Sequence, residues 1–160
     1  MKKPFTPNRL PGRTPDPELS AEFGREVLLI EAVPVAAGDV VHLRFERATP
    51  NPRQGVWLAT QGSLQIASAS ASQFVLWRDT SPKVVEITVL ETDGLLRFYN
   101  VFEREPGTGS FLSHMNAAGM ISQGRDDGWI EYGCNDFGVG QGFEKLVFSV
   151  LVPRQSPQGR

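Results

Sequence analysis

Alternation of apolar and polar residues along almost every segment is the feature that most constrains the fold of this chain. Between residues 39 and 47, for example, Val41, Leu43 and Phe45 alternate with charged or polar neighbours. A repeat of two residues is typical of a β-strand, whereas no segment of ten residues carries the 3.6-residue apolar stripe of an amphipathic helix. The nearest approach to a helix is a turn near Ser110–Ala117. We therefore expect helix in less than about 10% of the chain, against the usual ~30–35%.

Strand-like segments recur roughly every eight to twelve residues, a spacing typical of sandwiches and barrels. The 16 glycines and 12 prolines supply turn residues between them. We expect hairpins at Gly62, at Thr92–Gly94 and at Arg125–Gly128, because glycine adopts the positive φ that such turns require. The expected strands are 27–33, 39–47, 56–60, 64–67, 73–78, 84–91, 95–103, 118–123, 129–134 and 146–152. About nine or ten short strands predict an all-β fold, an antiparallel β-sandwich of the jelly-roll type.

A chain of 160 residues is expected to form one domain. Residues 1–20 contain five prolines, which remove amide donors and block helix formation. This segment is predicted to be an extended arm, either disordered or laid along a partner. Residues 21–152 are then the β-sandwich domain, and residues 153–160 a polar, flexible tail.

The composition of the chain limits the classes of partner that we expect and indicates a cellular compartment. The net charge of −2 provides no basic field for a phosphate backbone, so we expect no nucleic-acid partner. No apolar run approaches the ~20 residues of a membrane span, so no membrane partner is expected either. Cys134 is the only cysteine, which excludes an internal disulfide and fits a reducing compartment. With no signal peptide visible after Met1, the sequence predicts a cytoplasmic protein.

The best candidate site lies before the last strand, where Asn135 and Asp136 precede a glycine-rich run and Glu144 follows it. Calcium binds six to eight oxygen ligands from carboxylates, amides and backbone carbonyls, and a glycine-rich loop frees carbonyls to supply some of them. One interpretation is therefore a calcium site made by Asn135, Asp136 and Glu144. The other is a hydrogen-bonded loop without a cofactor, in which Asn135 and Asp136 accept backbone amides and Glu144 pairs with Lys145 or an arginine.

This ending resembles that of bacterial β-sandwich domains of unknown function that read Tyr-x-Cys-Asn-Asp, a short loop and Phe-Asp-Asp-Leu-Val-Phe. The matching segments here are Tyr132–Asp136 and Phe143–Phe148, and Leu76–Pro82 and Arg97–Glu103 look like parts of the same set. The resemblance covers roughly Gln54 to Phe148. Similar calcium-bearing sandwich domains carry two acids before Leu-Val, whereas this chain has Glu144 and then Lys145. The resemblance therefore implies that the Lys145 ammonium replaces or excludes a calcium ion.

Two further segments carry candidate chemistry. Trp129 opens a strand beside an Asp-Gly turn, where an exposed ring could stack on a sugar, although tryptophans in apolar runs are usually core residues. His114 follows a glycine-rich segment, and a hydrolase would use it as a base with Asp126, Asp127 or Asp136. No nucleophile motif accompanies His114.

The sequence leaves three functions open. We favour a non-catalytic binding module whose loops contact a protein or a carbohydrate, with Trp129, Asn135, Asp136 and Glu144 as ligand-binding residues. The second is a structural assembly subunit that forms homo-oligomers by adding its N-terminal arm to a neighbouring copy. The third is the hydrolase centred on His114.

Overall fold

The computed structural model describes residues 11–103, 105–112, 118–136 and 142–153. Within these residues the protein is all-β, with 58% strand and one helix, so the expected all-β class and low helix content are confirmed. The expected jelly-roll sandwich is wrong, because eight antiparallel strands close into a barrel with three extra strands attached. Alternation specifies strands with one buried face, and a barrel satisfies that pattern as well as a sandwich does.

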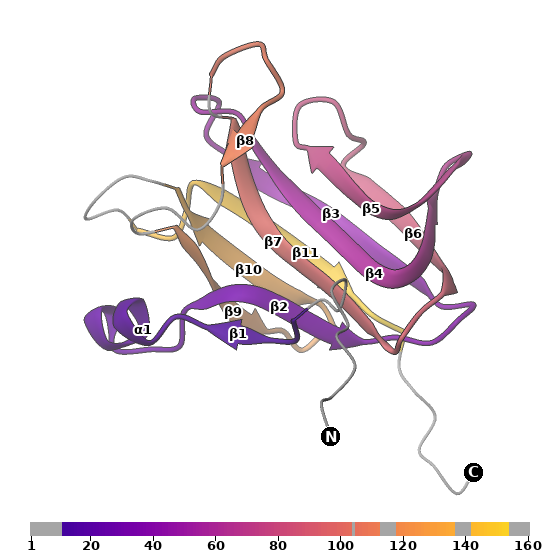
Figure 1. Cartoon of the computed structure of the whole chain (residues 1–160). Helices are drawn as coiled ribbons and strands as arrows, with labels where there is room; N and C mark the ends of the chain where they lie inside the picture. The colour runs from indigo at the N-terminus through magenta and orange to yellow at the C-terminus, as the bar shows by residue number, and fades with distance from the viewer. Residues whose placement is uncertain (1–10, 104, 113–117, 137–141, 154–160) are drawn as a thin grey trace, which may run out of the picture.

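The elements follow one another along the chain with short connections (Figure 1). The helix is α1 (Pro17–Phe23), and the strands are β1 (Thr14–Pro15), β2 (Leu28–Pro34), β3 (Val40–Ala48), β4 (Gln54–Ile66), β5 (Ala69–Trp77), β6 (Val84–Glu91), β7 (Leu95–Glu103), β8 (Phe111–Leu112), β9 (Gly119–Gly124), β10 (Ile130–Asn135) and β11 (Leu146–Leu151). The described part of the expected Ser110–Ala117 turn, residues 110–112, contains β8 and no helix.

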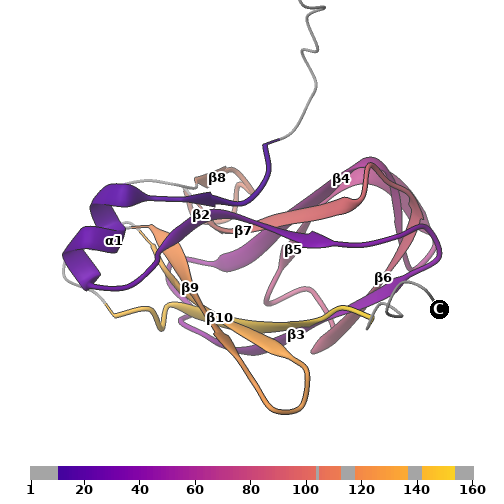
Figure 2. The same ribbon diagram turned by 90° about the horizontal axis from the view of Figure 1, so that it is seen from below.

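Closure of the barrel depends on one pairing between strands that are distant in sequence. The strand order is β2-β9-β10-β11-β3-β6-β4-β7, and β7 returns to pair with β2 in the register Glu31↔Phe98 and Val33↔Leu96. Figure 2 shows β2 and β7 on one side of the interior and β10 and β3 on the other. The extra strands β1, β5 and β8 pair with β2, β4 and β7 respectively.

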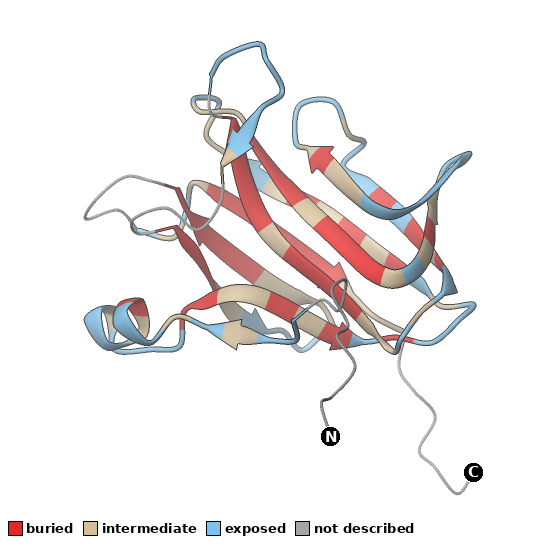
Figure 3. Cartoon of the chain, in the orientation of Figure 1, coloured by how far each residue is buried: buried red, intermediate tan, exposed pale blue. Residues whose placement is uncertain are grey.

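Apolar side chains fill the middle of the barrel. Phe98, Tyr132 and Phe148 are each at most 1% exposed, and the centroids of their rings lie 5.1–5.8 Å apart. Buried segments run along the strands of the closed sheet (Figure 3). The last strand, β11, is central, since it pairs with both β10 and β3. The interior is therefore a packed core of the kind that small barrels form.

Two of the three expected hairpins are wrong. Gly62 lies inside the continuous strand β4, where the pairing with β5 shifts register between Ala59 and Leu64. The turn at Thr92–Gly94 joins strands that do not pair, since β7 pairs with residues 54–59 of β4 and β6 with residues 63–65. The glycines at positions 62 and 94 predicted chain reversals. Neither reversal forms a hairpin, because β5, β6 and β7 all pair with β4. The hairpin at Arg125–Gly128 is confirmed by the pairing of β9 with β10.

Gly62 allows the link between β6 and β7 to pack on the backbone of β4. A Cβ atom at residue 62 would collide with the backbone of Glu91 and Thr92, and the φ of Gly62 is +151°. Beside it, the Thr60 hydroxyl lies 2.6 Å from the Thr92 hydroxyl and donates to the Leu95 carbonyl at 2.8 Å. The close backbone approach therefore requires glycine at position 62.

We predict that Gly62→Ala lowers the free energy of unfolding by about 2 kcal/mol or more, because the added methyl group forces two backbones apart. Gly124→Ala is the control, since a Cβ atom at residue 124 meets nothing within 4 Å. Urea unfolding of both variants measures the difference. Equal stability of the two variants would contradict the role assigned to Gly62.

The expected extended arm is wrong for residues 17–20, which belong to α1, whereas residues 11–16 contain no helix and include β1. Residues 1–10 lie outside the described residues. Pro17 occupies the first turn of α1, where the missing amide has no partner to lose. The Asp16 carboxylate caps the helix by accepting the Leu19 amide at 3.1 Å, and Gly24 ends it in the left-handed conformation. The prolines were predicted to block helix, but one at the first helical position is compatible with it.

Two arginines attach the N-terminal segment to the barrel. Arg97, 3% exposed, donates to the Pro11 carbonyl at 2.7 Å and to both Asp93 carboxylate oxygens at 3.0 and 2.8 Å. Arg13 donates to the buried Glu31 at 3.1 Å, and Glu31 also accepts the Tyr132 hydroxyl at 2.8 Å. Residues 11–23 therefore pack against their own barrel.

The Arg97–Asp93 pair predicts a pH dependence of stability. The hydrogen bonds from Arg97 lower the pKa of Asp93 from 3.8 to about 2, so its stabilisation is complete above pH ~4 and is lost as pH falls towards 2. We expect Asp93→Asn to cost about 1–2 kcal/mol at pH 7 and to flatten the decline in stability between pH 4 and 2. Urea unfolding across this range measures both effects, with Asp126→Asn as the control. An Asp93→Asn variant as stable as the parent at pH 7 would disprove the anchoring role of this pair.

Candidate functional site

The inward face of the barrel becomes polar at one end. Gln54 lies two residues before the core residue Val56 on β4, Asn100 lies two residues after Phe98 on β7, and Asp136 follows Cys134 by two residues at the end of β10. Since strand side chains repeat every two residues, these three share the register of the core. With Asn135 they form a buried group in which each residue is at most 2% exposed, which we call the mouth cluster (Gln54, Asn100, Asn135 and Asp136).

Hydrogen bonds link the mouth cluster across strands. The Gln54 side-chain amide donates to Asp136 Oδ2 at 3.3 Å and to the Pro52 carbonyl at 3.2 Å. The Asn100 amide donates to the Asn135 carbonyl at 2.7 Å. These contacts tie the start of β4 and the end of β7 to the end of β10.

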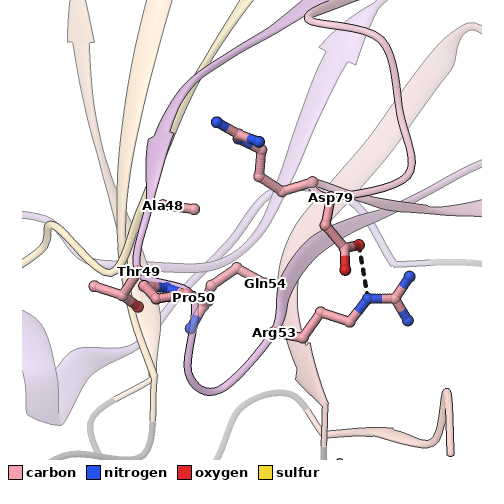
Figure 4. Close-up of a pocket in the computed structure, with 7 residues that line it drawn as sticks. Ala48, Thr49, Pro50, Arg53, Gln54 and Asp79 are labelled. Atoms are coloured by element: carbon pink, nitrogen blue, oxygen red, sulfur yellow. Dashed lines mark hydrogen bonds and ion pairs between the residues drawn. The ribbon is translucent and has the colours of Figure 1, made fainter. Parts of the chain in front are cut away.

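A pocket of about 300 Å³ opens beside the mouth cluster. Its walls come from the β3–β4 connection, the start of β4 and the segment after β5. The lining residues are Ala48, Thr49, Pro50, Arg53, Gln54, Arg78 and Asp79. Figure 4 shows Ala48, Thr49 and Pro50 on one side and Arg53 and Asp79 on the other.

Gln54 belongs to both the mouth cluster and the pocket wall. It is 1% exposed, and its Oε1 atom has no hydrogen-bond partner within the described ranges. A buried acceptor without a partner costs free energy, and buried amides in native proteins nearly always find a donor. Gln54 lines the pocket, but its Oε1 atom is itself buried, so a donor in the pocket reaches this atom only when the Gln54 side chain turns towards it.

Arg53 is held from three directions. Its Nε donates to Asp79 Oδ1 at 2.7 Å, its Nη1 lies 3.5 Å from Glu103 Oε2, and its guanidinium lies 4.5 Å from the ring centroid of Trp77. Glu103 in turn accepts the backbone amides of Gly107 and Gly109 at 3.1 and 3.0 Å. These contacts fix the Arg53 guanidinium at the pocket wall and leave its charge balanced.

Arg78 is the second cation of the pocket. Its backbone amide donates to the Gln54 carbonyl at 2.9 Å, which places it directly after β5. Its guanidinium is exposed and makes no ion pair or hydrogen bond with the described part of the chain. An arginine of this kind can bind an anionic group without first breaking another contact.

The structure brings together two of the three residues expected to hold calcium. Asn135 and Asp136 are buried in the mouth cluster. The Glu144 side chain is 77% exposed and pairs with Arg47 at 3.2 Å. No group of three or more His, Cys, Asp or Glu side chains able to hold a metal occurs in the described ranges. Calcium binding stays a prediction from the sequence.

Trp129 is half-buried on the outer face of the barrel. The Arg44 guanidinium lies 4.1 Å from the centroid of its ring. Arg44 also donates to Glu46 at 2.8 Å, and Glu46 accepts the Ser149 hydroxyl at 2.8 Å. Trp129 thus lies beneath a network of charged side chains.

The residues of the hypothetical hydrolase are placed only in part. His114 lies outside the described residues. Asp126 and Asp127 are in the β9–β10 turn, whereas Asp136 follows the other end of β10, and a strand of six residues separates its ends by about 20 Å. These carboxylates therefore do not form one catalytic group.

Cys134 is fully buried in the core, and burial raises the pKa of its thiol. The thiol therefore stays protonated and acts as a small apolar side chain.

Sequence reasoning missed the pocket. Gln54, Arg53, Arg78 and Asp79 come from two segments that approach only through the β4–β5 pairing. A signal for part of the site was visible, because Arg78 and Asp79 lie within the Leu76–Pro82 run that marks the resemblance. In the sequence, this run indicates only the resemblance and does not indicate a binding site.

No protein family, curated protein or solved structure matches this chain. The resemblance to bacterial β-sandwich domains stays a hypothesis. The described residues include no helix that is long and apolar enough to span a membrane.

We predict that Asp136→Ala lowers the free energy of unfolding by about 1–3 kcal/mol, because it removes the acceptor of the buried Gln54 amide. Asp126→Ala, in an exposed turn, serves as the control and should change stability by less than about 0.5 kcal/mol. Chemical denaturation measures both variants. A neutral effect of Asp136→Ala would show that the mouth cluster is solvated and not a structural network.

Proposed function

We propose that this protein is a non-catalytic binding module that takes a carbohydrate unit in the pocket beside the mouth cluster. The observation that carries the proposal is the pocket itself, whose wall includes Gln54, a buried side chain with an Oε1 atom that lacks a partner among the described residues. A sugar hydroxyl is a donor of suitable size for such an acceptor. Of the two partner classes that the sequence favoured, a carbohydrate is therefore preferred over a protein.

The dimensions and composition of the pocket support this choice. A volume of about 300 Å³ is at the lower end of the range for small-molecule sites. Its polar groups are an amide, a carboxylate, a hydroxyl and two guanidiniums, which can donate to and accept from a ring of hydroxyls.

The alternative assembly function draws less support. Residues 11–23 contact their own barrel through β1, Arg13 and Arg97, so this part of the arm is already engaged. The hydrolase draws no support, since its proposed base His114 lies outside the described residues.

The test is saturation-transfer NMR on a pool of D-glucose, D-galactose, D-glucuronate and D-galacturonate. We expect the protein to transfer saturation to at least one sugar and to leave every sugar chemically unchanged. Thr49→Trp should abolish the signal, because the ring fills the pocket at the end of β3. Val40→Trp is the matched control, since it adds the same ring to an exposed residue at the start of β3. A pool without any bound sugar, or binding unaffected by Thr49→Trp, would refute the proposal.

A further inference from the structure

The charges on the pocket walls favour one negative charge on the ligand. The lining contains two guanidiniums, from Arg53 and Arg78, and one carboxylate, from Asp79, so its net charge is +1. Arg53 is already paired with Asp79 and Glu103. The Arg78 guanidinium pairs with no described side chain. Arg78 is therefore the positive charge that an anionic ligand can neutralise.

The chemistry of Arg78 favours a carboxylate over a phosphate. The planar fork of a guanidinium matches a carboxylate through two parallel hydrogen bonds. A phosphate dianion would bring a second negative charge next to Asp79, and like charges at such short range repel. The pocket is therefore suited to a singly charged carboxylate.

A bare carboxylate leaves two acceptors of the pocket without donors. Gln54 Oε1 has no partner among the described residues, and Asp79 Oδ2 is free of the hydrogen bond that Oδ1 accepts from Arg53. A ligand that also carries hydroxyl groups can supply donors to these acceptors.

We infer that the ligand is a uronic acid, a sugar whose carboxylate binds Arg78 and whose hydroxyls donate to Gln54 and Asp79. This inference rests on the carbohydrate-binding function proposed above and specifies its substrate class. The same pocket then discriminates against neutral sugars, which leave Arg78 unmatched, and against simple anions, which leave Gln54 unmatched.

Calorimetric titration of the full chain with four separate probes tests the inference: D-glucuronate, D-glucose, acetate and inorganic phosphate, at one ionic strength. We expect D-glucuronate to bind at least ten-fold more tightly than each of the other three. Arg78→Ala should reduce the affinity for D-glucuronate to that for D-glucose, and Arg78→Lys should restore only part of the difference. Arg47→Ala is the matched control, because Arg47 is exposed, pairs with Glu144 and does not line the pocket.

The outcomes separate the inference from the function on which it rests. Equal binding of D-glucose and D-glucuronate would overturn the uronic acid and leave carbohydrate binding intact. Tight binding of phosphate without binding of either sugar, or no binding of any probe, would overturn both. Loss of D-glucuronate binding in Arg47→Ala as well as in Arg78→Ala would show that net charge, and not the geometry at Arg78, attracts the ligand.

Discussion

The pairing of β2 with β7 closes the sheet, and the rest of the structure depends on it. Residues 31–34 and 95–98 form this ladder between segments more than sixty positions apart in the chain. An open sheet would expose two edges, whereas the β2–β7 ladder pairs these two edges with each other. Closure also commits one face of every barrel strand to a shared interior, which Phe98, Tyr132 and Phe148 fill.

A filled interior restricts where such a barrel can bind a ligand. The middle is packed with rings and aliphatic chains, so polar groups on the inward face occur where strands reach an end. The mouth cluster arises in this way, because Gln54 and Asp136 continue the inward register of β4 and β10 beyond their apolar residues, and Asn100 follows Phe98 in the register of β7. Hydrogen bonds between these strands hold the cluster, and the pocket forms where the β3–β4 connection and the end of β5 meet it.

Much of the secondary structure could be predicted from the sequence, because alternation and turn residues act locally. The segments that became β3, β6, β7, β10 and β11 were identified within a few residues, and the Asp-Gly hairpin before β10 was correct. Barrel closure could not be predicted, since both a sandwich and a barrel bury one face of each strand. Gly62 was misinterpreted because a glycine permits a reversal and also permits close backbone contact. At Gly62 the pairing of strands along β4 requires close backbone contact and not a reversal of the chain. At Gly94 the expected hairpin is absent because both flanking strands pair with β4 and not with each other.

The site was predictable only in part, for the same reason. Asn135 and Asp136 stand out as polar residues at a strand end, and the structure buries them in the mouth cluster. Glu144 was grouped with them by proximity in sequence, but its side chain points to solvent beside Arg47. Gln54 gave no signal, because a single glutamine at the start of a strand is usually exposed. Its burial follows from barrel closure, which no local pattern encodes.

The most direct test of the account follows the Gln54 side-chain amide by NMR during titration with D-glucuronate. We expect the signals of the Gln54 side-chain NH₂ and of the backbone amides of Arg78 and Asp79 to shift together and to saturate at one concentration. Amide shifts confined to the outer face around Arg44 and Trp129, with the Gln54 signals unmoved, would contradict it. In that case the polar end of the barrel would serve the fold alone.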